Sequence, residues 1–406
     1  MLRHVVYCAP FPGIAATHRF GKALRSLDGI RLVGVFQEPP KGEAAKIYDD
    51  VAIVENALDA KQLLAGVETL RRRHGPPDRI LGILENLQVQ LAAVRGHFGL
   101  PGGDVAAAER FRDKATMKDA LRLVGIPCAR HRRLHAEEDV WAFASEIGFP
   151  IVLKPTAGAG SKATYEIRDA AALRGALQDI AQIGVKGMIA EEFLDGREYS
   201  FETICIRGTP VFHSIGRYFP GPLEVTRTPW LQWVCVLPRD ISGPWFDGAR
   251  AIGFDAVQKL GMTSGMTHME WFRRGDGTLA VGEIAMRPPG AQFVSLMSYA
   301  HDTDMYRAWA RAAVDDAFDG PFPRKYAVGI SYLRGQGAGR VAAVDGLDEA
   351  QRKVGPLVVE TKLPRIGAPK SDSYEGDGFA IVRHPEDDVV LAAMKTIVET
   401  VQVRYA

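Results

Sequence analysis

The stretch Thr267-His-Met-Glu-Trp-Phe-Arg-Arg-Gly-Asp-Gly-Thr-Leu-Ala-Val-Gly-Glu-Ile-Ala-Met-Arg287 places an Asp-Gly pair between two largely apolar runs. Asp-Gly in this setting is a strong signal for a β-hairpin. If Asp276 and Gly277 form a two-residue loop, Gly275 pairs with Thr278. Counting back along both strands, Glu270 then faces Glu283. The turn therefore predicts two carboxylates side by side.

Two facing glutamates predict a bound cation. Side chains directly opposite each other in an antiparallel pair lie about 4.5–5.5 Å apart at Cβ, and like charges there are destabilising. Mg²⁺ suits such a pair, because it is commonly held by one or two carboxylates and completed by substrate phosphates. The pair therefore favours nucleotide chemistry. The alternative is an exposed hairpin in which Glu270 and Glu283 point apart into solvent.

The composition is that of a globular protein with room for two or three domains. The chain has 406 residues, 47% apolar and 24% charged, with a formal net charge of +1 and a pI near 7.7. This charge provides no general attraction for nucleic acid or an anionic membrane, so neither is expected as a partner. No apolar stretch is long enough for a signal peptide or a membrane span, and we expect a cytoplasmic protein. The four cysteines are widely spaced, so we expect them to be small buried apolar residues and not disulfides or zinc ligands; they are Cys8, Cys128, Cys205 and Cys235.

The first hundred residues predict an open Rossmann-like α/β unit. Short apolar runs alternate there with helical patterns, which is typical of a parallel sheet. The predicted strands are Val5–Tyr7, Arg31–Phe36 and Ile80–Leu84, and helical spacing of apolar residues runs through 63–70 and 87–98. The first strand is followed by Cys8-Ala-Pro-Phe-Pro-Gly13 instead of Gly-x-Gly-x-x-Gly, so a dinucleotide-binding dehydrogenase is not indicated.

A glycine-rich loop follows a strongly apolar strand at 150–154. It offers free backbone amides, a hydroxyl and an ammonium group, as a phosphate cradle needs, through Gly158, Gly160, Ser161 and Lys162. Lys154 ends the strand and is either snorkelling or aimed at an anion. The loop is no Walker loop, and the strand-like run after it predicts a hairpin. A flexible surface turn is the alternative interpretation of this loop.

The hairpin gathers further polar side chains on one face. By the period of two, Arg287 shares the face of Glu283, and His268 shares the face of Glu270. Arg287 could clamp a carboxylate or a phosphate with its planar guanidinium group, or it could form an ion pair with one of the two glutamates. His268 is a candidate catalytic residue, with a structural role as the alternative.

Taken together and in this order, the motifs of the chain resemble the ATP-grasp superfamily, and in particular its carboxylate-amine ligases, including amino-acid ligases and the biotin carboxylase type. The motifs are Arg112-Asp-Lys114, Val152-Leu-Lys-Pro155, the loop 158–162, Glu191-Glu-Phe-Leu194, Gly196-Arg-Glu198, His268-Met-Glu270 and Glu283-Ile-Ala-Met-Arg-Pro-Pro-Gly290. The resemblance implies an α/β fold with a Rossmann-like domain at 1–108. A two-lobed ATP-grasp domain at 109–320 would follow, with a mobile lid at about 127–190, and a C-terminal α/β segment at 321–406 would pack on it.

The resemblance also implies roles for these residues. Lys114 and Lys154 would contact the phosphates of ATP, and the loop 158–162 would close over them. The adenine and ribose would be bound by the segment that contains Glu191, Glu192, Leu194 and Glu198. Glu270 and Glu283 would hold Mg²⁺, with Mn²⁺ as the alternative metal, and Arg287 would bind the carboxylate or its acyl phosphate. Many members of the family have Asn where this chain has Ala285, which puts a second metal site in doubt.

The implied reaction is ADP-forming ligation. A carboxylate, expected to be that of an amino acid, attacks the γ-phosphate of ATP, and an amine then displaces phosphate from the acyl phosphate. One alternative is a carboxylase-like or nucleotide-biosynthetic enzyme that uses bicarbonate or another small acid. A second alternative is an ATP-binding regulatory module without turnover. A homodimer is left open.

The sequence says little about the two substrates. Glu85 follows the third predicted strand of the first domain, at the carboxyl edge where open α/β sheets bind ligands, and is a candidate for the substrate amine. Arg217 and Arg227 are candidates for polar anchors of a substrate pocket, with exposed surface arginines as the equal alternative. Trp230 and Trp233 lie in the same segment, and their interpretation as core residues is slightly favoured.

Overall fold

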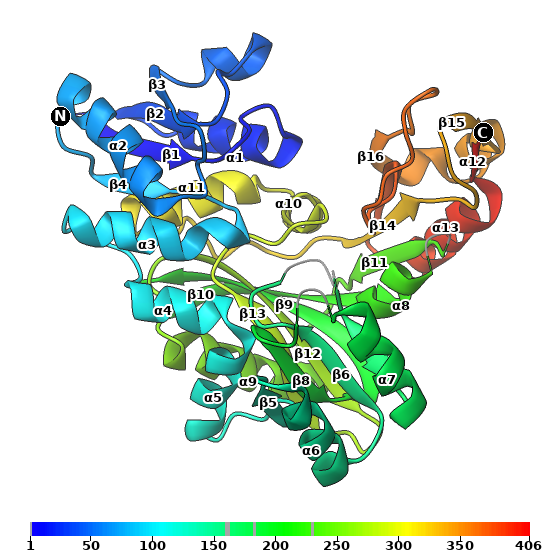
Figure 1. Cartoon of the computed structure of the whole chain (residues 1–406). Helices are drawn as coiled ribbons and strands as arrows, with labels where there is room; N and C mark the ends of the chain where they lie inside the picture. The colour runs from blue at the N-terminus through cyan, green and yellow to red at the C-terminus, as the bar shows by residue number, and fades with distance from the viewer. Residues whose placement is uncertain (1, 159–162, 182–183, 229–230) are drawn as a thin grey trace.

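The computed structural model describes residues 2–158, 163–181, 184–228 and 231–406, and within these ranges the chain forms four β-sheets (Figure 1). It is a mixed α/β fold, as predicted. Three of the sheets lie in consecutive parts of the chain, and the fourth is a two-stranded pair near the C-terminus.

The N-terminal sheet is parallel, with the strand order β3-β2-β1-β4. Its strands are β1 (Arg3–Cys8), β2 (Ile30–Phe36), β3 (Asp50–Ile53) and β4 (Arg79–Leu81), and its helices are α1 (Ala15–Arg25), α2 (Ala60–His74) and α3 (Gln88–His97). The three predicted strands are confirmed, but the last ends at Leu81 instead of Leu84. The sequence analysis missed β3, a strand of only four residues. A Rossmann-like parallel layer is therefore present.

A small antiparallel sheet, with the order β5-β8-β6-β7, forms the middle of the chain. It comprises β5 (His131–Arg133), β6 (Ile151–Pro155), β7 (Tyr165–Ile167) and β8 (Met188–Glu192), with α6 (Glu137–Ile147) and α7 (Ala170–Asp179) beside it and α4 (Val105–Arg112) and α5 (Lys114–Leu123) before it. Leu153 pairs with Tyr165, which confirms the hairpin predicted around the glycine-rich loop.

The largest sheet has eight antiparallel strands in the order β13-β12-β9-β10-β11-β14-β17-β16. Its strands are β9 (Gly196–Ile206), β10 (Thr209–Phe219), β11 (Trp233–Leu237), β12 (Gly265–Arg274), β13 (Leu279–Ala285), β14 (Ala327–Leu333), β16 (Val358–Lys362) and β17 (Gly378–His384). Strands from beyond residue 321 thus continue the sheet that carries the glutamate hairpin. The domain limits 109–320 and 321–406 remain a prediction.

The remaining helices cover the large sheet or cap its C-terminal part. They are α8 (Pro222–Arg227), α9 (Asp247–Lys259), α10 (Phe293–His301), α11 (Met305–Asp315), α12 (Leu347–Val354) and α13 (Asp387–Thr400), with short 3₁₀ turns at Gly42–Lys46, Glu85–Leu87, Pro244–Phe246 and Gly355–Leu357. The fourth sheet pairs β15 (Val341–Asp345) with β18 (Gln402–Tyr405). One apolar core runs from α1 through α11 and α10 to the large sheet.

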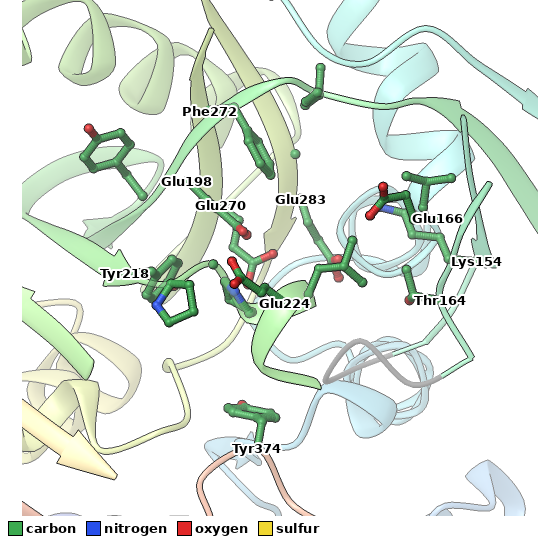
Figure 2. Close-up of a pocket in the computed structure, with 18 of the residues that line it drawn as sticks. Lys154, Thr164, Glu166, Glu198, Tyr218, Glu224, Glu270, Phe272, Glu283 and Tyr374 are labelled. Atoms are coloured by element: carbon green, nitrogen blue, oxygen red, sulfur yellow. The ribbon is translucent and has the colours of Figure 1, made fainter. Parts of the chain in front are cut away.

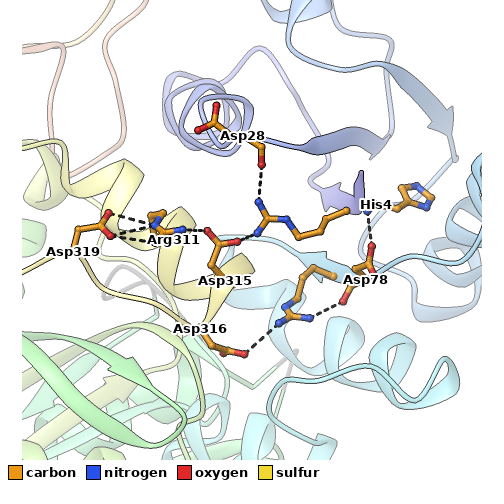
Figure 3. Close-up of polar contacts among 9 residues, drawn as sticks. His4, Asp28, Asp78, Arg311, Asp315, Asp316 and Asp319 are labelled. Carbon is orange, nitrogen blue, oxygen red and sulfur yellow. Dashed lines mark hydrogen bonds and ion pairs between the residues drawn. The ribbon is translucent and has the colours of Figure 1, made fainter. Parts of the chain in front are cut away.

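Ion pairs join α11 and the residues after it to the N-terminal sheet (Figure 3). Arg3 pairs with Asp315, which also pairs with Arg311. Arg79 lies 3.2 Å from a carboxylate oxygen of Asp316. Because these contacts flank the apolar core shared by α1 and α11, they hold the N-terminal sheet against α11.

The cysteines and the helices agree with the general expectations from composition. Cys8, Cys205 and Cys235 are buried, Cys128 is half-buried, and all four are free thiols. Within the described ranges, none of the helices has both the length and the apolar character that a membrane crossing requires.

Candidate active site

The glutamate hairpin forms, but its loop differs from the prediction. Arg274 donates its backbone N–H to Thr278 O at 2.8 Å, so Gly275, Asp276 and Gly277 make a three-residue loop. Gly277 has φ +84°, the left-handed conformation that closes such loops and that glycine adopts without strain. The predicted pairing of Gly275 with Thr278 is therefore wrong, and the strands next to the turn are displaced by one residue from the predicted register.

A β-bulge at Gly282 restores the predicted register further along the hairpin. Trp271 pairs with Val281, whereas Glu270 pairs with Glu283, so Gly282 is the extra residue. A Cβ atom at Gly282 would lie 2.8 Å from the Phe272 ring, which leaves no room for a side chain. The two one-residue displacements cancel. Glu270 and Glu283 are therefore cross-strand partners as predicted, although the two-residue loop from which this pairing was counted is wrong.

A cavity of about 1130 Å³ opens over the hairpin (Figure 2). It is larger than the roughly 300–1,000 Å³ of ordinary small-molecule pockets, so it has room for more than one ligand. The predicted site residues that line it are Glu85, Lys114, Lys154, Gly158, Glu191, Glu192, Leu194, Glu198, Arg217, Arg227, His268, Glu270, Glu283 and Arg287. Gly160, Ser161, Lys162 and Trp230 lie outside the described residues.

Two lysines from different parts of the chain reach acidic side chains in this cavity. Lys114, at the first residue of α5, places Nζ 2.9 Å from Glu283 Oε1 and donates to Gly158 O at 3.1 Å. Lys154, at the end of β6, places Nζ 2.9 Å from Glu191 Oε2. Lys114 thus reaches the hairpin from α5, whereas Lys154 pairs within the small sheet, and both side chains line the cavity.

Burial and charge separate the protonation behaviour of the carboxylates. Burial opposes ionisation of Glu283, but Lys114 and Lys154 overcome it and lower its pKa to about 2. Burial, together with the charge of Glu283, raises the pKa of Glu270. The pKa of Glu198 is raised well above its ordinary value by burial and then by Glu270. The site thus holds more negative charge than its lysines neutralise, which fits a bound cation.

The donor set suits a hard cation shared with a phosphate ligand. Glu270 and Glu283 offer carboxylate oxygens, and among the described residues no group of three or more acidic, histidine or cysteine side chains forms a metal cluster. Mg²⁺ is commonly held by one or two carboxylates and completed by phosphates and water. Ala285, which lines the same cavity, adds no donor.

Arg287 pairs with Glu85 instead of the hairpin glutamates. Its Nη2 lies 2.7 Å from Glu85 Oε2, across 202 positions of sequence, and Arg112 approaches the other Glu85 oxygen at 3.7 Å. The predicted alternative of an ion pair with Glu270 or Glu283 is wrong, because the N-terminal domain supplies the partner. A guanidinium and a carboxylate therefore stand together at the cavity, as groups that could bind the two charged ends of an amino acid.

The imidazole of His268 contacts the buried carboxylate of Glu202. Its Nδ1 lies 3.0 Å from Glu202 Oε1, and its Nε2 is 3.9 Å from Glu270 Oε1. Glu202 has no solvent exposure, and its second oxygen has no hydrogen-bond partner within the described part of the chain. The pair fixes the orientation of the imidazole beside Glu270.

Comparison with known proteins identifies the central part of the chain. The family model described as the ATP-grasp domain matches residues 119–300. This region is an ATP-grasp domain. The match includes the small sheet β5-β8-β6-β7, the glutamate hairpin and most of α10. The match begins at residue 119, so Lys114, which lines the cavity, lies before the matched region.

Relatives and solved structures share the ATP-grasp organisation. The L-arginine-specific L-amino acid ligase of Bacillus subtilis is 29% identical over 251 residues, which are 60% of this chain and 59% of that protein. The crystal structure of an L-amino acid ligase from Bacillus licheniformis has a TM-score of 0.80 at 19% identity, covering 100% of this chain and 99% of that one. The biotin carboxylase domain of the Hydrogenobacter thermophilus 2-oxoglutarate carboxylase, solved as a dimer with MgADP, ADP and bicarbonate, has a TM-score of 0.69 at 17% identity, covering 100% and 91%.

Three residues predicted to bind the nucleotide or a substrate contact other protein side chains in this structure. Glu192 pairs with Arg130 at 2.7 Å and Arg274 at 2.9 Å, which ties the small sheet to the hairpin. The guanidinium of Arg217 lies over the Trp245 ring, 5.5 Å from its centroid. Arg227 pairs with Glu166 of β7. These three residues line the cavity, and their side chains are held by protein partners there.

The sequence analysis missed three residues of this site. Lys118 is fully buried, donates to Gly282 O at 2.5 Å and lies 3.4 Å from Glu191. Its position four residues after Lys114 on α5 was an available signal. Glu202 and Tyr374 gave no such signal, because Glu202 lies within a run of apolar and hydroxyl residues and Tyr374 lies in a turn far along the chain.

Proposed function

We propose that this protein is an ATP-dependent, ADP-forming ligase that joins the carboxylate of an amino acid to an amine. The observation that carries the proposal is one cavity in which three kinds of group meet. Glu270 and Glu283 face each other, Lys114 and Lys154 flank them, and Arg287 stands beside them with Glu85. Metal-binding carboxylates, phosphate-binding cations and a carboxylate-binding arginine are the groups that this reaction needs.

The first half-reaction forms an acyl phosphate. The substrate carboxylate attacks the γ-phosphate of ATP, the bond to the bridging oxygen breaks, and ADP leaves. Such a transfer needs mainly positioning and neutralisation of charge. Lys114 and Lys154 supply positive charge at the phosphates, and Arg287 orients the carboxylate. Glu270 and Glu283 would hold Mg²⁺, which neutralises phosphate charge when bound.

The second half-reaction forms the amide. An uncharged amine attacks the acyl carbon, the bond between that carbon and the phosphate oxygen breaks, and the proton lost by the nitrogen leaves on the inorganic phosphate. His268, oriented by Glu202 and adjacent to Glu270, is the proposed catalytic side chain on this part of the hairpin. Glu85 is the candidate group for the ammonium of the substrate whose carboxylate Arg287 binds. The glycine-rich loop after β6 would exclude water from the acyl phosphate.

The comparisons support this proposal at the level of the family. The Bacillus subtilis relative is an L-arginine-specific L-amino acid ligase, and the match spans 59% of its length. The carboxylase-type neighbour supports the fold alone. The rival function, a carboxylase-like enzyme that uses bicarbonate or another small acid, therefore becomes an outcome of the experiment.

The proposal is tested by ADP and phosphate release from ATP and Mg²⁺ across a matrix of amino acids, supplied singly and in pairs, with bicarbonate as a separate arm. We expect release only with productive pairs, and a product of dipeptide mass. The Glu283→Gln variant should lose at least about 100-fold in rate, because the site then lacks one of its two metal carboxylates.

A matched control is Glu349→Gln, the same chemical change at an exposed glutamate of α12 that pairs with Lys353. It should leave the rate unchanged. Release driven by bicarbonate alone would contradict the amino-acid proposal and favour the rival. Tight binding of ADP without release in any arm would favour a regulatory nucleotide-binding module.

A further inference from the structure

One end of the cavity is aromatic and comes from four separate elements. Tyr218 lies on β10, Trp233 on β11, Phe293 at the start of α10, and Tyr374 between β16 and β17. The charged residues of the proposed nucleotide site, by contrast, come from α5, β6, β8 and the glutamate hairpin. The cavity therefore combines charged and aromatic lining residues, and its volume exceeds the needs of one ligand.

The aromatic rings form one connected wall. The Tyr218 and Trp233 ring centroids are 5.7 Å apart, those of Tyr218 and Phe293 are 5.9 Å apart, and those of Trp233 and Tyr374 are 5.0 Å apart with the planes at 78°. These separations are typical of interacting aromatic pairs. Trp233 also stacks on Tyr332 in the core, with the ring centroids 4.7 Å apart, so core packing holds the wall in place.

Tyr374 is the side chain that the C-terminal segment adds to this wall (Figure 2). It lies in a tight turn in which Gly376 donates its N–H to Ser373 O at 2.9 Å, and Ser371 donates its N–H to Asp377 at 2.9 Å. Tyr405 of β18 also contacts Asp377 through a hydrogen bond. The turn is thus built by its own contacts. Tyr374 itself remains half-buried and borders the cavity.

Tyr374 lines the same cavity as the Arg287–Glu85 pair, which connects the wall to a ligand with charged groups. Trp233 is only 2% exposed, and its indole N–H has no hydrogen-bond partner within the described residues. The indole nitrogen is itself buried, so Trp233 supports the wall from the core side and offers no donor to a ligand.

We propose that this wall binds the side chain of one substrate, and that the substrate is an amino acid with an aromatic side chain. The inference rests on the proposed ligase function. The Arg287–Glu85 pair would hold the α-carboxylate and α-ammonium groups, and the side chain would lie against Tyr374 and Tyr218. Tyr374 is then the specificity residue that the C-terminal segment contributes. An aromatic ring suits the site because it can pack at the edge or face of Tyr374 and Tyr218, which Trp233 and Phe293 support from the core side.

The first test is equilibrium binding by calorimetry in the presence of ADP and Mg²⁺, with phenylalanine, tyrosine, alanine and arginine as probes. We expect phenylalanine or tyrosine to bind at least about tenfold more tightly than alanine or arginine, because a buried ring adds contact area and ring packing. Tyr374→Ala should abolish this preference. Tyr374→Phe should keep it within about threefold, because the ring is retained.

Two controls distinguish a local effect on the aromatic wall from a general loss of folded structure. Affinity for ADP alone should be the same in all variants. Ile366→Ala, at a residue of the same C-terminal segment that is 61% exposed, should bind every probe as the unaltered protein does. In turnover, the KM for the aromatic amino acid should rise about tenfold in Tyr374→Ala, while the KM for ATP stays within twofold.

The outcomes distinguish the two proposals. Equal binding of all four probes, tighter binding of arginine, or a preference unchanged in Tyr374→Ala would overturn the aromatic subsite. Ligation of small amino acids without any use of aromatic ones would overturn it as well and leave the ligase function intact. Aromatic binding that depends on Tyr374, with no ADP release in any amino-acid pair, would support the subsite and contradict the ligase function.

Discussion

Lys118 is the buried cation that connects the two acidic parts of the site. Its side chain has no exposure, and its Nζ contacts both Gly282 O and Glu191. Burial lowers its pKa, so the ammonium is retained only because these partners are in place. Glu191 depends in turn on Lys118 and Lys154, which lower its pKa against the effect of burial. A charged pair of this kind is costly to break from one side.

We predict that Lys118→Met lowers the free energy of unfolding by about 3 kcal/mol, because it leaves Glu191 with one cation and the bulge carbonyl without its donor. Urea unfolding measures this. The double variant Lys118→Met with Glu191→Gln should recover more than half of the loss, since both buried charges of the pair are then removed. A single variant within about 0.5 kcal/mol of the unaltered protein would contradict the assigned role.

At the scale of the element, the β12–β13 hairpin decides whether the two glutamates meet. Its three-residue loop shifts the strands by one position, and the bulge at Gly282 shifts them back. The bulge is stabilised by the Lys118 hydrogen bond and by the absence of a side chain at Gly282. Phe272, whose ring fills that space, also packs with Leu194, a predicted adenine contact. A change in the hairpin geometry at Gly282 should therefore move Phe272 and affect the proposed nucleotide site.

We predict that Gly282→Ala destabilises the protein by about 1–2 kcal/mol, because the new Cβ would lie 2.8 Å from the Phe272 ring and 3.3 Å from Glu270 O. Displacement of Phe272 should also weaken ADP binding, by about tenfold in calorimetry. Gly275→Ala, in the same hairpin but with nothing within 4 Å of the new Cβ, is the matched control and should change neither quantity. Equal effects of both substitutions would argue against a role of the bulge.

At the scale of the whole molecule, a buried histidine couples stability to pH. His301, at the end of α10, is 5% exposed and donates through Nδ1 to Phe322 O at 3.0 Å. Burial, followed by the nearby charge of Arg324, lowers its pKa to about 4. His213 of β10 is shifted to about 4 as well, by burial and then by Arg324. Both lie near Arg324, which lies between α11 and β14 and donates a hydrogen bond to Ser214 of β10.

We predict that the free energy of unfolding decreases as the pH falls below about 6.5. In the unfolded chain His301 binds a proton near pH 6.5, whereas the folded protein resists protonation until about pH 4, so the unfolded state gains stability throughout this interval. His301 alone should cost about 2 kcal/mol between pH 7 and pH 5.

The contribution of His301 is isolated by urea unfolding of two variants at pH 7 and pH 5. His301→Gln retains a donor without titrating and should show a smaller loss than the unaltered protein. His135→Gln, at an exposed histidine, should retain the full loss. If His301→Gln has the same pH dependence as the unaltered protein, protonation of His301 does not limit stability.

The sequence by itself determined the features that depend on neighbouring residues. Alternation of apolar runs specified the parallel N-terminal layer, the turn between β12 and β13 specified a hairpin, and the ordered motifs specified an ATP-grasp domain, which the family match confirms. Short periodicities and turn chemistry act over a few residues, so they can be recognised without the fold. They failed for the four-residue β3 and for the number of residues in the hairpin loop.

Only the tertiary structure decided which distant groups meet. The choice of Glu85 as the partner of Arg287 spans 202 positions, the approach of Lys118 to Gly282 spans 164, and Tyr374 reaches the cavity from a turn between two strands of the large sheet. Nothing in the residues around each of these side chains encodes its partner. The partner is set by how the layers pack, because burial allows a charge or a polar group only where another element supplies its counterpart.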